Sequence, residues 1–265
     1  MKNLYSEILR IMSRAGEIIT APPVEEIQDS VNVKMGDVTN LVTYYDVAVQ
    51  KYLIKELSAV CPTAAFLAEE EGQNNASESE YCFIIDPIDG TTNFTRGYRH
   101  SCISVALAQS GKVIFGAVYE PYHKDMYHAI RGEGAYLNGE RICVSESPLE
   151  RSIAAIGTAP YYKNELGRAI ISLTEQFYYS CIDIRRIGSA ALDLCYTAVG
   201  KFELFCELRL SPWDFAAGAL ILTEAGGTVT NERGEELDPL SPSAVLASNT
   251  VTHGALLDMV KRAMG

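Results

Sequence analysis

The stretch IIDPIDGTTNF, residues 84–94, brings two carboxylates three residues apart to the end of an apolar run. The apolar residues predict a strand that ends at Ile85, so that Asp86 and Asp89 lie at its C-terminal edge. Asp-Pro and Asp-Gly pairs are also common in turns, because proline fixes one φ angle and glycine tolerates tight conformations. Gly90 and the two threonines after it can begin a helical turn whose N–H groups face an anion.

Two other acidic segments have the same character. Three consecutive glutamates follow an apolar run in FLAEEEG, residues 66–72, and Asp214 stands before an Ala-rich helix in SPWDFAAGA, residues 211–219. A charge run is usually a solvated loop, and Asp214 could simply be an N-cap. Hard cations such as Mg²⁺ prefer oxygen ligands, so carboxylates beside a phosphate-accepting turn also fit metal-assisted phosphoryl chemistry.

The composition narrows the partners. The chain of 265 residues has 34 acidic and 22 basic residues, a formal net charge of −12, which opposes a nucleic-acid or anionic-membrane surface as partner. The seven cysteines are scattered without a C-x-x-C pair, so neither a disulfide framework nor a zinc site is indicated. No apolar run is long enough to span a bilayer, and charged residues interrupt the N-terminal segment. We therefore expect a cytoplasmic protein without a nucleic-acid or membrane partner.

The first half of the chain predicts two helices on an antiparallel sheet. Apolar residues recur at helical spacing over residues 4–19 and 47–57, and residues 31–43 suit a hairpin. Short strands separated by glycine-containing turns then follow at 81–86, 101–109, 113–121, 125–130 and 134–138.

The second half predicts alternating strands and helices. The expected strands are 152–157, 182–186, 201–207, 227–230 and 244–249, and the expected helices are 163–179, 190–199, 215–225 and 253–264. Such alternation indicates α/β layering. The fold class expected is therefore α+β followed by α/β, with an N-terminal subdomain 1–146 and a C-terminal subdomain 147–265 divided near residues 145–148.

Two motifs together resemble the signatures of a known family. DPIDGTTNF (86–94) and WDFAAGALILTEAGG (213–227) are similar to the two signatures of the inositol monophosphatase family, the Mg²⁺-dependent, lithium-sensitive phosphatases. LAEEEG (67–72), IGSAALDLC (187–195) and the spacing between the signatures agree as well, so the resemblance covers nearly the whole chain. It implies a layered αβαβα sandwich, two or three Mg²⁺ ions, a phosphate-ester substrate and a homodimer.

The resemblance also implies site residues. The implied metal ligands are Glu69, Asp86, the carbonyl of Ile88, Asp89 and Asp214, with Glu70 the alternative to Glu69 in the triple-Glu run. The implied catalytic residues are Glu69 and Thr91, which contact the attacking water, and Asp46, which orients Thr91. The implied substrate contacts are Gly90, Thr91 and Thr92 for phosphate, and Gly188, Ser189, Ala190, Glu207 and Asp214 for the sugar end. Metal ions about 4 Å apart would activate a water for in-line attack without a phosphoenzyme.

The substrate expected is a small polyol phosphate, above all inositol monophosphate, because Thr92-Asn93-Phe94 favours the inositol-type enzymes. Alternatives are phosphatases of fructose 1,6-bisphosphate, histidinol phosphate or adenosine bisphosphate, and a non-catalytic binding protein of the same fold. Arg209 has the same strand parity as Glu207, which predicts that both side chains emerge on one face. Arg209 or Arg99 would then be placed to bind a second anionic group.

Overall fold

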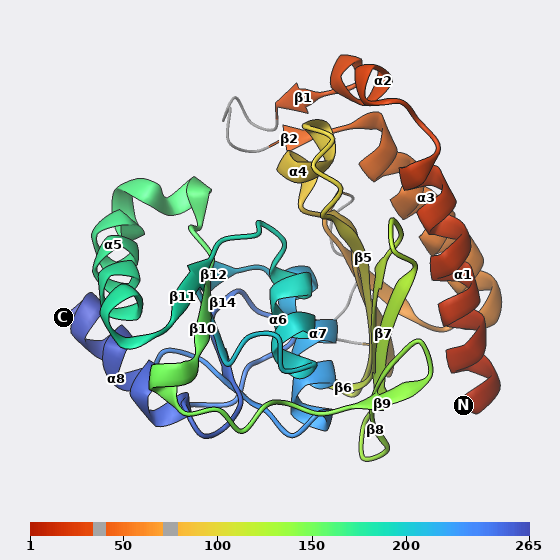
Figure 1. The fold of residues 1–265 in the computed structure, drawn as a ribbon. Helices are drawn as coiled ribbons and strands as arrows, with labels where there is room; N and C mark the ends of the chain where they lie inside the picture. Colours follow the sequence, from red (N-terminus) through yellow and green to blue (C-terminus); the bar gives the residue numbers. More distant parts are fainter. Residues whose placement is uncertain (34–40, 71–78) are drawn as a thin grey trace.

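Helices and sheets alternate in five layers (Figure 1). The computed structural model describes residues 1–33, 41–70 and 79–265. Helices α1 and α3 cover the outer face of a seven-stranded sheet, α6 and α7 lie between this sheet and a five-stranded one, and α5 and α8 cover the far face. The expected layered αβαβα sandwich is confirmed.

The α-helices are α1 (Lys2–Thr20), α2 (Val24–Asp29), α3 (Tyr44–Val60), α4 (Thr91–Thr95), α5 (Lys163–Ser180), α6 (Ala190–Ala198), α7 (Pro212–Glu224) and α8 (His253–Met264). The strands are β1 (Asn32–Val33), β2 (Leu41–Val42), β3 (Ala65–Ala68), β4 (Tyr81–Asp89), β5 (Cys102–Gln109), β6 (Lys112–Glu120), β7 (Asp125–Ile130), β8 (Gly134–Leu137), β9 (Glu140–Ile142), β10 (Ile153–Ile156), β11 (Asp183–Arg185), β12 (Leu204–Leu210), β13 (Thr228–Thr230) and β14 (Ser243–Ser248). No helix among the described residues is both long and apolar enough to cross a bilayer.

The larger sheet has the order β3-β4-β5-β6-β7-β8-β9, and only the β3–β4 pair is parallel. Its outer face receives the apolar stripe of α1, where Tyr5 stacks on Phe115 of β6 at 4.7 Å between ring centroids. The helical spacing expected for residues 4–19 is thereby explained. The predicted hairpin at 31–43 is described only by the antiparallel pairing of β1 with β2, since residues 34–40 lie outside the described residues.

The strand that carries the Asp-Pro-Ile-Asp sequence does not end at Ile85 as predicted. β4 continues to Asp89, and the register on β5 slips between Asp86 and Asp89, where three steps along β4 meet two steps along β5. A β-bulge accommodates a residue without an N–H donor, so Pro87 does not break the strand. The bulge therefore allows a proline to stand between the two acids of this strand.

The smaller sheet has the order β11-β10-β12-β14-β13. β10 pairs in parallel with β11 and β12, whereas β14 is antiparallel to β12 and β13. The parallel strands are joined through helices, as parallel connections require. The alternation predicted for the second half is confirmed by this layer.

Helix α7 is packed closely on both sides. A Cβ atom on Gly116 of β6 would lie 2.8 Å from the carbonyl oxygen of Ala217, and one on Gly218 would lie 2.8 Å from the Leu194 side chain of α6. At the C-terminal end of α7, Glu224 accepts hydrogen bonds from the N–H groups of Gly132 and Gly134, at 2.8 and 2.9 Å. Small residues thus allow the helix to sit within touching distance of the sheet backbone.

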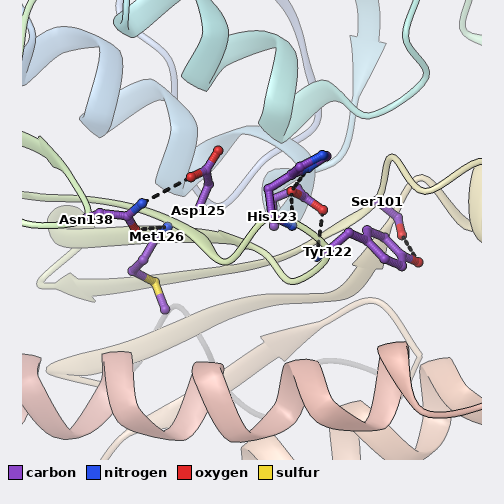
Figure 2. Close-up of polar contacts among 7 residues, drawn as sticks. Ser101, Tyr122, His123, Asp125, Met126 and Asn138 are labelled. Atoms are coloured by element: carbon purple, nitrogen blue, oxygen red, sulfur yellow. Dashed lines mark hydrogen bonds and ion pairs between the residues drawn. The ribbon is translucent and has the colours of Figure 1, made fainter.

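A polar cluster fixes the turn after β6 (Figure 2). The buried carboxylate of Glu120 accepts hydrogen bonds from the backbone N–H groups of Tyr122 and His123, both at 2.9 Å. The Tyr122 hydroxyl lies 3.3 Å from that of Ser101, just before β5. Ser101 in turn borders Gly90, where an added Cβ would lie 3.4 Å from the Ser101 Cβ. The turn thereby supports the segment beside the end of β4.

Gly116→Ala is expected to destabilise the protein by about 1–3 kcal/mol, because the new methyl group would press on the α7 backbone. Urea unfolding measures this loss. The matched control is Gly167→Ala in α5, where an added Cβ meets nothing within 4 Å. It should leave stability unchanged or raise it by up to about 1 kcal/mol, since alanine is the better helix former. Equal stability of Gly116→Ala and the parent protein would contradict the close packing of α7.

Candidate active site

A cavity of about 370 Å³ opens where the end of β4 meets β12 and the first turns of α6 and α7. Its lining contains six carboxylates and one guanidinium: Glu69, Asp86, Asp89, Asp193, Glu207, Asp214 and Arg186. Residues from the segments 88–92, 157–162, 188–190 and 210–213 and Leu41 complete the wall. The structure thus brings residues from six separate stretches of the chain to one acidic cavity.

Asp86 and Asp89 flank the bulge of β4 and both face the cavity. Oδ1 of Asp86 accepts a hydrogen bond from the Ile88 N–H at 3.0 Å. Oδ2 of Asp89 accepts from the Ser189 hydroxyl and from the Ala191 N–H, both at 2.7 Å. Asp89 therefore rests on the N-terminus of α6, where the helix dipole favours a negative charge.

Asp214 is held by the start of α7. Its Oδ2 accepts from the Ser211 N–H at 2.7 Å, and Ser211 and Asp214 form a capping box. The N-cap of α7 is Ser211, three residues before Asp214. The interpretation of Asp214 itself as the N-cap is therefore wrong. The capping contact uses one carboxylate oxygen and leaves the side chain on the cavity wall.

The triple-Glu run contributes Glu69. Glu69 lines the cavity, whereas the N–H of Glu70 is bonded to the Gln50 side chain at 2.9 Å and Glu70 is absent from the lining. Glu71 lies outside the described residues. The geometry therefore favours Glu69 over Glu70 as the residue that faces a ligand, and its role remains a prediction.

Thr91, Asp46 and the Ile88 carbonyl form a connected group. The Thr91 hydroxyl lies 3.3 Å from Oδ1 of Asp46 and 3.1 Å from the Ile88 carbonyl oxygen. Asp46 is buried, and a capping box with Thr43 fixes it at the start of α3. A hydroxyl has one hydrogen, so Thr91 can donate to only one of the two acceptors at a time.

The acids repel one another. Burial raises the pKa of Asp86 well above its ordinary value, and the neighbouring charges of Glu69 and Asp89 raise it further. Burial, followed by Asp89 and Glu69, likewise raises the pKa of Asp214 well above normal. For Asp89 burial is again the largest cause, but hydrogen bonds from Ser189 and Ala191 oppose it and the pKa is about 6. Clustered acids of this kind are stabilised when cations neutralise them.

The donor set fits Mg²⁺. The carboxylates and the Ile88 carbonyl are hard oxygen ligands, and the described lining contains no histidine or cysteine, the ligands that zinc prefers. In the part of the chain that the structure describes, no three acids, histidines or cysteines already stand together as a formed metal centre. The chemistry of the acids and their mutual repulsion support cation binding, and the assignment of individual ligands stays a prediction.

Two glycines shape the rim between β4 and α6. Gly90 has φ = 92°, in the left-handed region, and an added Cβ would lie 3.1 Å from the His100 carbonyl and 3.2 Å from that of Gly188. Asn93 closes this junction, since its amide nitrogen donates to the carbonyls of His100 and Ile187, both at 2.8 Å. Asn93 of the first motif therefore has a structural role that joins α4 to the segment before α6.

Glu207 reaches the cavity from β12. Its Oε1 accepts from the Ala159 N–H at 2.9 Å, and Gly157 leaves it room, because a Cβ there would lie 2.0 Å from Oε2. Burial raises the pKa of Glu207 to about 7, while the Ala159 hydrogen bond and Arg186 act against this rise. Gly188, Ser189 and Ala190 line the same wall, so the residues expected at the sugar end are brought together.

The expectation for Arg209 is wrong. The register of β12 on β14 slips between Glu207 and Leu210, so strand parity does not carry from Glu207 to Arg209. The Arg209 guanidinium lies 5.6 Å from the ring centroid of Tyr162 and borders a neighbouring cavity. Arg99 does not line the acidic cavity either.

Sequence reasoning missed Arg186 and Asp193, which both line the cavity. Arg186 donates from Nη2 to the Thr158 hydroxyl at 3.1 Å and passes over Gly188, where an added Cβ would lie 2.3 Å from Nη1. Asp193 lies in the first turn of α6. The motif IGSAALDLC contains Asp193 and follows Arg186 directly, and only the fold shows that both face the Glu207 end.

The alternating layers of helices and sheets place the protein in the class of αβαβα sandwich proteins, and this one has an acid-lined cavity. The model of the inositol monophosphatase family matches residues 2–264, and the chain belongs to this family, which is of phosphatase type.

The chain is similar to relatives of two names. It is 33% identical to Nus factor SuhB of Escherichia coli K12 over 260 residues, which cover 98% of this chain and 96% of that one. The suhB extragenic suppressor protein of Bartonella henselae has a TM-score of 0.88 and 31% identity over 97% and 98% of the two chains. An inositol monophosphatase of Anabaena has a TM-score of 0.86 and 29% identity over 98% and 96%.

Asp89→Asn should stabilise the metal-free protein by an amount that grows with pH. The folded-state pKa of Asp89 is raised, so its ionisation costs no stability below the unfolded pKa of about 4 and costs most once the pH exceeds about 6. The advantage of the variant in EDTA should therefore increase by about 2–3 kcal/mol from pH 4 to pH 7, measured by urea unfolding. Asp258→Asn, on the exposed face of α8, is the control and should show a pH-independent difference. A flat profile for Asp89→Asn would contradict the raised pKa of Asp89, of which burial is the largest cause.

Proposed function

We propose that the protein hydrolyses a small polyol phosphate monoester in the presence of Mg²⁺, most specifically inositol monophosphate to inositol and phosphate. The observation that carries this proposal is the concentration of Glu69, Asp86, Asp89 and Asp214 on one cavity beside the start of α4. An acidic cavity can bind a phosphate dianion only when cations lie between them. Membership of a phosphatase-type family supports the same reaction.

In this proposal Glu69, Asp86, Asp89, Asp214 and the Ile88 carbonyl hold the cations. Two or three bound Mg²⁺ ions would lower the pKa of a water, neutralise the phosphate and stabilise the leaving alkoxide. The anchored oxygens of Asp89 and Asp214 keep each carboxylate oriented, since each already accepts a backbone N–H. Asp86, the Ile88 carbonyl and Asp89 belong to β4 and Asp214 belongs to α7, whereas Glu69 follows the end of β3, and cation binding would draw these groups together.

Thr91 and Asp46 would position the nucleophile. When the Ile88 carbonyl is engaged as a ligand, the Thr91 hydroxyl donates to Asp46, which lies 3.3 Å away. The oxygen of Thr91 would then accept a hydrogen bond from the attacking water, and Glu69 would accept a second hydrogen bond from it. This orients the water for in-line attack on phosphorus.

The phosphate and the polyol would occupy opposite ends of the cavity. Gly90, Thr91 and Thr92 supply donors to the phosphate oxygens at the start of α4. Gly188, Ser189, Ala190, Glu207 and Asp214 would face the polyol, and all five line the cavity. The Ser189 hydroxyl already donates to Asp89, so its contact with substrate would come from the backbone.

A second anionic group on the substrate is the alternative that one observation favours. Arg186 is the only basic residue of the described cavity lining, and its guanidinium stands over the mouth beside Gly188. It would suit a bisphosphate of the superfamily, such as fructose 1,6-bisphosphate. Inositol monophosphate remains the first choice, because the acidic side chains of Asp193 and Glu207 line the same cavity.

The net charge of −12 supports a small-molecule partner rather than a nucleic acid. Some relatives of the chain are named Nus factor, so a second role beside hydrolysis is a separate candidate function. Phosphate-release assays do not test such a role. The homodimer, the lithium sensitivity and the cytoplasmic location implied by the sequence remain part of the proposal.

Asp89→Asn is expected to lower kcat by more than a hundredfold, because the change is nearly isosteric but removes a charge from the cation site. Phosphate release from inositol monophosphate with Mg²⁺ measures this, and exhaustive chelation of the parent protein should have the same effect. Asp258→Asn serves again as the control with full activity. Retention of more than about a tenth of the activity, which is only ~1.4 kcal/mol in barrier terms, would exclude Asp89 as a ligand.

Arg186→Ala is expected to lower kcat/KM for fructose 1,6-bisphosphate at least tenfold and to change that for inositol monophosphate less than twofold. The reason is that the guanidinium lies at the polyol end, away from the cation ligands. Arg209→Ala is the matched control and should alter neither ester, because Arg209 borders another cavity. An equal loss for both esters would show that Arg186 supports the common part of the site.

A further inference from the structure

The cavity lining contains one acidic residue, Asp193, to which the proposed reaction assigns no role. Asp193 lies in the first turn of α6, faces the cavity and is only 2% exposed. Its backbone is satisfied, since its N–H donates to the Ser189 carbonyl and its own carbonyl accepts from Thr197 at 2.9 Å. Only the carboxyl group of Asp193 therefore lacks a structural explanation.

The carboxylate of Asp193 has an orphaned oxygen. Oδ1 is fully buried and has no hydrogen-bond partner among the described residues. Buried polar atoms are almost always bonded, and an unpaired carboxylate oxygen is costly to keep. Glu207 is the contrasting case, because the Ala159 N–H occupies one of its oxygens.

Internal partners do not account for Asp193. Arg186 contributes favourably to its charge, but no ion pair in the described part of the chain joins the two, and the guanidinium bonds to Thr158 instead. The first N–H groups of α6 are also taken, because Asp89 and the Ser189 hydroxyl accept them. A role as a helix cap is thereby excluded.

Asp193 faces Glu207 more than the cation ligands. After burial, Glu207 is the largest cause that raises the pKa of Asp193, ahead of Asp89. Asp193 of α6 and Glu207 of β12 line the same cavity, and no donor of the described residues bonds to the Asp193 carboxyl group. Hydroxyl groups of a polyol can supply such donors, whereas a second phosphate would be repelled by ionised acids.

We propose that Asp193 is a specificity-determining residue whose Oδ2 accepts a hydrogen bond from a substrate hydroxyl, next to the hydroxyl held by Glu207. Oδ1 is closed off from the cavity, so the contact uses Oδ2, which has no hydrogen-bond partner among the described residues either. This inference rests on the proposed function and narrows its substrate class to phosphate esters with at least two adjacent hydroxyl groups. Arg186 lines the same cavity, and its positive charge favours the ionised form of both acids, although no ion pair joins it to either one among the described residues. Esters that lack hydroxyls gain nothing from Asp193.

The test compares two substrates with Mg²⁺: myo-inositol 1-phosphate, and p-nitrophenyl phosphate, which has no hydroxyl. Asp193→Leu removes both acceptor oxygens at similar volume and should lower kcat/KM for the inositol ester at least tenfold, mainly through KM, while p-nitrophenyl phosphate changes less than twofold. Asp193→Asn keeps one acceptor oxygen and should recover part of the loss. Equal losses for both esters, or no loss for either, would overturn the proposal.

Thermal unfolding in EDTA provides an independent readout. Asp193→Leu should keep or raise the Tm, because it removes a buried carboxyl group that has no internal partner, whereas a structural aspartate would lower it on removal. The control is Glu203→Gln, a buried acid outside the cavity whose oxygens accept from the Ser145 hydroxyl at 2.9 Å and the Ile153 N–H at 2.7 Å. It should lower the Tm and leave the ratio of the two substrates unchanged. A lower Tm for Asp193→Leu with an unchanged ratio would assign Asp193 to the fold.

Failure of the proposed function gives a different pattern. If the parent protein hydrolyses p-nitrophenyl phosphate but not the inositol ester, phosphatase chemistry stands and the polyol role of Asp193 is refuted. If it hydrolyses neither ester, the proposed reaction fails. Calorimetric titration with myo-inositol 1-phosphate and Mg²⁺ then tests whether Asp193 contributes to binding. Tenfold weaker binding to Asp193→Leu would then support the contact, and equal binding would reject it.

Discussion

Electrostatic repulsion among buried carboxylates is the constraint on which the site depends. Asp86, Asp89, Asp214 and Glu69 come from three separate parts of the chain, and burial together with the neighbouring acids raises the pKa of the three aspartates. The hydrophobic contacts of the three cores must outweigh this cost when no cation is present. The layered fold thus supplies the stability that holds an unfavourable cluster of charges in place.

Helix starts restrain these acids. Asp46 and Asp214 each form a capping box with a residue three positions earlier, and Asp89 accepts from the first turn of α6. A single carboxylate can satisfy an N–H group with one oxygen and face a ligand with the other. The local interpretation of such an acid as a helix cap and the functional interpretation as a ligand are therefore compatible.

The layers and the acids of the two motifs were predictable, because apolar periodicity and motif spacing are local properties of the chain. The extension of β4 was not, since a bulge admits proline where a regular strand would end. The register shift in β12 also made the prediction for Arg209 wrong, because strand alternation does not continue from Glu207 to Arg209. Arg186 and Asp193 were missed because their meaning depends on which residues from β12 and the 157–159 turn lie opposite, and no sequence pattern encodes that juxtaposition.

The double-sided packing of α7 has a consequence for how the molecule can open. The helix contacts the seven-stranded sheet through Gly116 and α6 through Gly218, and Glu224 ties its far end to the turn before β8. Its buried amides can reach solvent only when both neighbouring layers separate, so their hydrogen exchange should report global unfolding. A chain divided at residue 146 would leave this helix with one apolar face bare, so we expect the two halves to unfold together as one cooperative unit.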